Sequence, residues 1–105
     1  MSTLTADTTK GTLTGSGTQD IIATASGGSA QETYCVIFRN YSGTDRTVTL
    51  YLNGTTSTDV FDSETVDASG GRLVLTISVG PSDVVRAEAS AGSSIAWFCS
   101  KGILT

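Results

Sequence analysis

The sequence predicts an all-β fold, an antiparallel two-sheet sandwich of about seven strands. Three observations support this: short runs in which apolar and hydroxyl-bearing side chains alternate, the abundance of Thr, Val, Ile and aromatic residues in those runs, and the Gly, Ser, Asn and Asp residues between them. Strands that recur every ~8–12 residues are typical of an immunoglobulin-like or jelly-roll sandwich. A small barrel is the alternative architecture.

The N-terminal stretch differs in composition from the rest of the chain. Residues 1–17 are polar and rich in Thr, Ser and Gly, with Leu4 and Leu13 as their only strong apolar side chains. Because so little apolar surface cannot hold a segment in a core, we divide the chain into an extended N-terminal arm, 1–17, and a β-sandwich domain, 18–105. The arm is expected to lie on a neighbouring subunit, although it could equally add an edge strand to its own domain.

The strands of the domain follow from period-two alternation. Between residues 72 and 79 every odd-numbered position is apolar, and positions 48, 50 and 52 are Val, Leu and Leu, so these positions should face the core. Tyr51 should then face outward. Proline at Gly80-Pro81-Ser82-Asp83 and the pair Asn53-Gly54 predict a turn and a hairpin. The expected strands are 18–25, 32–40, 46–53, 58–66, 72–79, 83–89 and 94–101.

Two of these strands, 32–40 and 94–101, are apolar on both faces. They are either central strands whose outer face lies under a loop or the arm, or strands whose outer face meets another subunit. Trp97 and both cysteines, Cys35 and Cys99, are expected in the core, with the thiols reduced. The residues expected at a subunit interface are Leu4, Leu13, Tyr34, Val36, Phe38, Tyr51 and Phe98.

Composition argues against several functions. Charged residues are 15% of the chain and the net charge is −4, so no basic face for nucleic acid is expected. No apolar run approaches the ~20 residues of a membrane span, and no secretory signal is recognisable, which predicts synthesis in the cytoplasm. The chain has no histidine, which excludes Ser-His-Asp and Cys-His catalysis and the common zinc sites. We therefore expect no enzyme, no cofactor and no metal.

The one charged cluster is the acidic segment 59–67, with Asp59, Asp62, Glu64 and Asp67. Charged residues of this kind guard a solvated loop or an edge strand, which is the interpretation we adopt. The alternatives are a calcium site between strands and hydrolysis by paired carboxylates.

A strand that ends in the turn Asn40-Tyr41-Ser42-Gly43, the strand 46–52 after it, the turn at 80–83 and the closing Gly102-Ile103 resemble small β-sandwich structural proteins of tailed bacteriophage virions. The resemblance implies a capsid decoration or cement protein, made in the host bacterial cytoplasm, that stabilises the virion by binding the major capsid protein or other virion proteins. It also implies a homo-oligomer, a trimer or dimer. A head–tail connector or tail component is the alternative within the same resemblance.

A second hypothesis is a glycan-binding module of a fibre or adhesin. Tyr41 and Tyr51, if both are displayed outside the sheet, would supply the aromatic platform for a sugar.

Overall fold

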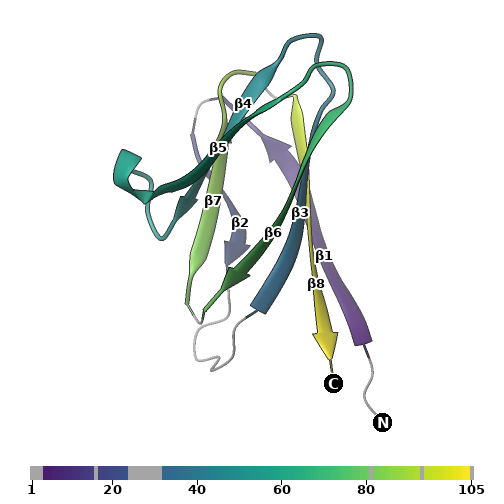
Figure 1. Ribbon diagram of the computed structural model, residues 1–105, viewed down its shortest axis with the longest axis vertical. Helices are drawn as coiled ribbons and strands as arrows, with labels where there is room; N and C mark the ends of the chain where they lie inside the picture. Colours follow the sequence, from purple (N-terminus) through teal and green to yellow (C-terminus); the bar gives the residue numbers. More distant parts are fainter. Residues whose placement is uncertain (1–3, 16, 24–31, 81, 93, 105) are drawn as a thin grey trace.

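The computed structural model describes residues 4–15, 17–23, 32–80, 82–92 and 94–104, with side chains described from residue 8 to residue 101 within these ranges, residue 23 excepted. The chain forms two four-stranded antiparallel sheets that pack face to face (Figure 1). The first sheet has the order β1 (Leu4–Leu13), β8 (Ile95–Leu104), β3 (Glu32–Asn40), β6 (Gly71–Val79). The second sheet has the order β2 (Gln19–Ala23), β7 (Val84–Ala89), β4 (Arg46–Leu52), β5 (Val60–Val66).

The predicted all-β sandwich is confirmed, and its strand order is that of a jelly roll. Consecutive strands lie in different sheets except for β4 and β5. This order decides between the two sandwich topologies that the sequence leaves open. β3 has the predicted bounds, whereas β8 continues to Leu104, beyond the predicted end at residue 101.

The N-terminal segment forms an edge strand of its own domain, which is the second of the two alternatives. β1 pairs with β8 from Leu4 opposite Leu104 to Leu13 opposite Ile95. Leu13 is fully buried in the core. The buried Leu13 at the end of the strand and the unbroken main-chain pairing with β8 hold the strand in the sheet, although most of its side chains are polar.

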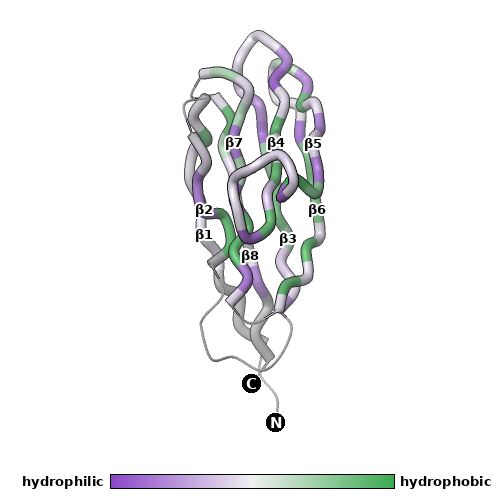
Figure 2. The backbone as a smooth tube through the Cα atoms, turned by 90° about the vertical axis from the view of Figure 1, so that its left-hand side faces the viewer, coloured by the Kyte–Doolittle hydropathy of each residue, from purple (hydrophilic) through white to green (hydrophobic). Residues whose placement is uncertain are grey.

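The core lies between the two sheets, and Figure 2 shows hydrophobic and hydrophilic residues alternating along the strands. Val48 and Leu50 of β4 are fully buried, as alternation predicts. Leu52 has the same parity but is exposed, because it lies at the open side of the sandwich beside a pocket. Trp97 is buried, as predicted, and its indole Nε1 is 3.4 Å from Gln19 Oε1.

The turn after β3 is fixed by the one polar side chain in the described core. Asn40 Nδ2 donates to the carbonyls of Thr44, at 2.8 Å, and Val66, at 3.0 Å. Its Oδ1 accepts from the backbone N–H of Ser42 at 3.0 Å. Asn40 is thus buried at little cost because its amide is satisfied on both sides, and it ties the turn to β5.

The connection between β4 and β5 is longer than the tight hairpin that Asn53-Gly54 predicts. It contains a single 3₁₀ turn, Ser57–Asp59, and Asn53 adopts a φ of 57°. Asp59 Oδ2 accepts from the backbone N–H of Thr56 at 3.1 Å. An added Cβ at Gly54 would lie 2.1 Å from the same oxygen, so the carboxylate occupies the space over this glycine.

Candidate interaction surfaces

The acidic side chains are not gathered into a metal-binding group within the residues that the structure describes. In those residues, no group of three or more His, Cys, Asp or Glu side chains could hold a metal ion. The four carboxylates of the acidic segment therefore form no such group in the described residues. Equally, no helix in the described part of the chain is long and apolar enough to cross a membrane.

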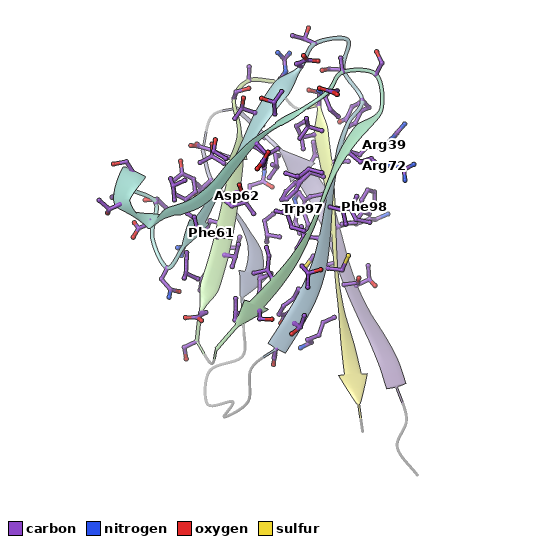
Figure 3. All side chains as sticks on the ribbon, viewed as in Figure 1. Arg39, Phe61, Asp62, Arg72, Trp97 and Phe98 are labelled. Carbon is purple, nitrogen blue, oxygen red and sulfur yellow. The ribbon has the colours of Figure 1, made fainter. Side chains whose placement is uncertain are left out.

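The outer face of the first sheet carries a row of apolar side chains. The strand register places Lys10 opposite Phe98, Phe98 opposite Ile37, and Ile37 opposite Val74. Phe98 is 40% exposed and Val74 57% exposed. We call Phe98, Ile37 and Val74 the apolar row. Figure 3 shows Phe98 outside the sheet, whereas its neighbour Trp97 lies between the sheets.

Next to the apolar row, the register places Arg39 directly opposite Arg72. Both side chains are exposed and project away from the molecule (Figure 3). In the four strands of the first sheet, the positions that point away from the second sheet include Lys10, Arg39 and Arg72 but no carboxylate. The two ion pairs among the described residues, Arg86 with Asp20 and Lys101 with Glu32, involve none of these three cations.

Arg39 and Arg72 are like charges that stand directly opposite one another, and such pairs destabilise a sheet. We call the apolar row with Lys10, Arg39 and Arg72 the basic face. In a chain with a net charge of −4, this face concentrates half of the six cations on one surface.

The predicted interface residues lie in three kinds of place. Leu13, Val36 and Phe38 are fully buried in the core, so their assignment to an exposed surface is corrected. Phe98 is exposed on the basic face, and Tyr34 is partly buried at the end of β3. The side chain of Leu4 lies outside the described part. On β3 the outward residues are Thr33, Cys35, Ile37 and Arg39. Because a cation is expected to face solvent, Arg39 is the signal in the sequence that identifies this face.

Tyr51 lies on the outer face of the second sheet but is only 7% exposed. It pairs with Arg86 on β7, and its hydroxyl donates to Glu88, which raises the pKa of the phenol. Tyr41 is half exposed, in the turn after β3. Because Tyr51 is covered, the two tyrosines do not form the displayed aromatic pair that a sugar platform requires.

The cysteines point to opposite sides of the first sheet, which corrects the expectation that both are core residues. Cys99 is buried, and its strand neighbour in register is Val36. Cys35 is exposed on the basic face, opposite Ser100. An apolar strand does not reveal which of its faces is inward when both faces are apolar, so the sequence could not separate the two thiols.

A second surface lies at the open edge of the second sheet, along β5. A bulge shifts the register between Leu50, which pairs with Asp62, and Tyr51, which pairs with Val60. Phe61 is left in the bulge and is 45% exposed. Val60 and Leu52 are exposed beside it. Bulges at a sheet edge redirect side chains in this way.

Phe61 borders an apolar pocket of about 230 Å³. The lining residues are Leu52, Phe61, Ile77, Ser78, Val79 and Val85. The pocket is smaller than the ~300–1,000 Å³ of small-molecule sites, so it suits one apolar side chain. We call Leu52, Val60, Phe61, Asp62 and Glu64 the acidic edge. The sequence pattern indicated the carboxylates of this edge but not its apolar part, which the adjacent Val60 and Phe61 could have indicated.

A polar cluster closes one end of the first sheet. Lys101 Nζ lies 3.1 Å from Glu32 Oε2 and 5.5 Å from the centre of the Tyr34 ring, and the Tyr34 hydroxyl donates to Glu32. Hydrogen bonds from Tyr34, which has the larger effect, and from Lys101 lower the pKa of Glu32. Burial and the bond to Glu32 raise the pKa of Tyr34, and the bond to Glu32 raises that of Lys101. The cluster is a structural clamp between β3 and β8.

No protein-family model matches the sequence, and no curated protein has a matching sequence. One solved structure is similar in fold, that of the Bacillus endospore appendages, which form a novel family of disulfide-linked pili. The superposition has a TM-score of 0.53 and 18% sequence identity, and it covers 96% of this chain and 85% of that chain. The shared property is the fold.

Proposed function

We propose that this protein is a non-enzymatic structural subunit that associates with copies of itself through its basic face. The observation that carries the proposal is the apolar row, in which the exposed Phe98 and Val74 flank the half-buried Ile37 on the surface of a small domain. Contiguous exposed apolar residues of this kind mark interaction sites. Arg39 and Arg72 repel one another in the isolated chain, and a partner carboxylate would relieve that repulsion.

The similar fold of a pilus subunit supports assembly into a polymer of many copies. The finer assignment that the phage resemblance implies, a capsid decoration protein located in the virion, requires the same subunit role but a different partner, the major capsid protein. We favour self-assembly, because a polymer requires no partner other than this chain. Its two exposed surfaces, the basic face and the acidic edge, can then both be used.

The test is the mass of the purified protein by sedimentation velocity over a wide range of concentration. We expect oligomers that grow with concentration. The double variant Phe98→Ser with Val74→Thr should shift the protein to monomers, whereas Tyr41→Ser, which removes an exposed aromatic ring from a turn, should assemble as the wild type does.

Each sample is measured with and without reductant, because Cys35 is exposed and the similar pili are disulfide-linked. Assembly that survives in reductant shows that surface contact suffices. A wild-type chain that stays monomeric at every concentration, with and without reductant, refutes the proposed function.

A further inference from the structure

We propose that the basic face binds the acidic edge of a second copy, so that subunits join head to tail. This inference rests on the proposed function and names the surface that receives the basic face. It is supported by charge, by apolar complementarity and by the positions of the two surfaces in the fold.

The charges of the two surfaces are opposite. The basic face presents Arg39 and Arg72 without a carboxylate, and the acidic edge presents Asp62 and Glu64, which form neither of the two ion pairs among the described residues. Contact between two basic faces would instead place the cations of both copies against one another. Complementary potentials favour the contact of unlike surfaces and suppress the contact of like ones.

The apolar parts match as well. The basic face offers raised side chains, with Val74 and Phe98 the most exposed of the row. The acidic edge offers the exposed ring of Phe61 and the pocket of about 230 Å³ beneath it. A raised apolar side chain on one surface and an apolar pocket on the other form a complementary pair that is not the same patch on both copies.

The two surfaces lie on different sides of the molecule. The basic face is the side of the first sheet that points away from the second sheet, whereas the acidic edge follows β5, the edge strand of the second sheet, with Leu52 of β4 beside it. Figure 3 shows Arg39 and Arg72 on one side and Phe61 and Asp62 on the other. Such a heterologous contact leaves one surface of each kind open at the ends, so it extends into a chain or closes into a ring.

Charge reversal tests the contact without removing apolar surface. The face variant carries Arg39→Glu and Arg72→Glu, and the edge variant carries Asp62→Arg and Glu64→Arg. The face variant keeps a like-charged pair across β3 and β6, so its folded stability should match the wild type, which circular dichroism and thermal unfolding check for all variants.

We expect each variant alone to need at least ~10-fold more protein for half-assembly than the wild type, because like charges would then face each other. An equimolar mixture of the two should assemble again, since each surface then finds its opposite. The variant with all four substitutions should assemble alone, and it keeps the wild-type net charge of −4.

An edge variant that assembles as the wild type does would overturn the inference and leave the proposed function intact, with another acceptor surface. Failure of both the mixture and the four-substitution variant to recover would also overturn it, because the charges would not face one another. If the wild type itself is monomeric, the proposed function fails and this inference fails with it.

Discussion

Replacing Arg72 by Glu should stabilise the monomer and weaken its assembly. In the wild type, Arg72 stands directly opposite Arg39, and both are exposed. The substitution converts a repulsive cross-strand pair into an attractive one, without any change in the core. If Arg72→Glu makes the monomer more stable but weakens assembly, then Arg72 serves the contact between subunits and not the stability of the fold.

The size of the effect follows from the exposure of the pair. Cross-strand charge pairs contribute about 0.2–1 kcal/mol of either sign, and exposure to solvent keeps such pairs near the low end of that range. The change from repulsion to attraction should raise the free energy of unfolding by about 0.5–1 kcal/mol. For a domain of this size, this corresponds to an increase in Tm of roughly 2–8 °C.

The assay is thermal unfolding followed by circular dichroism at low salt and at a protein concentration where sedimentation shows monomers, because oligomers raise the apparent Tm. Lys10→Glu is the matched control. It changes the net charge by the same amount on the same face, but Lys10 stands opposite Phe98 and has no cationic partner in register. An equal change of Tm in the two variants, or a decrease for Arg72→Glu, would refute the argument from pair repulsion.

Two further predictions concern the fold. Gly11→Ala should cost about 1–3 kcal/mol of stability, because the added Cβ would lie 2.7 Å from Trp97 Nε1, whereas Gly17→Ala, which meets nothing within 4 Å, should be close to neutral in the same urea unfolding experiment. The lowered pKa of Glu32 contributes stability above the ordinary value of 4.5 that is lost as the pH falls through the folded-state pKa. Glu32→Gln should therefore flatten the acid limb of a plot of Tm against pH below 4.5, and an unchanged acid limb would contradict this.

The fold class could be predicted because the sandwich is specified by local signals. The alternation in β4 and β6 and the turn residues between strands fix which segments are extended. The jelly-roll order could not be predicted, since periodicity does not say which sheet a strand joins. β1 could not be assigned to its own domain for a related reason. Its ladder with β8 is made by main-chain groups, which leave no pattern in the side chains.

For the proposed interaction surface, the sequence indicated the strands but not the outward residues. The sequence identified β3 and β8 as strands with an apolar outer face, but on β3 it selected Val36 and Phe38, which the structure buries. Both faces of the strand are apolar, so burial is decided by the opposite sheet. The charge of Arg39 marks the outer face more clearly than any apolar residue does, because a cation is rarely buried without a partner.

The pairing of Arg39 with Arg72 also bears on how assembly can be controlled. The repulsion between two exposed like charges costs an amount near the low end of about 0.2–1 kcal/mol. This is small beside the 5–15 kcal/mol that separates folded from unfolded domains, so the fold tolerates it in the free subunit. When the acidic edge of another copy neutralises the pair, that repulsion is relieved on contact. The relief of the repulsion is thus gained only on assembly. Each single contact stays weak, so a wrongly placed subunit can dissociate. Many such contacts in one polymer then supply the stability that a single contact lacks.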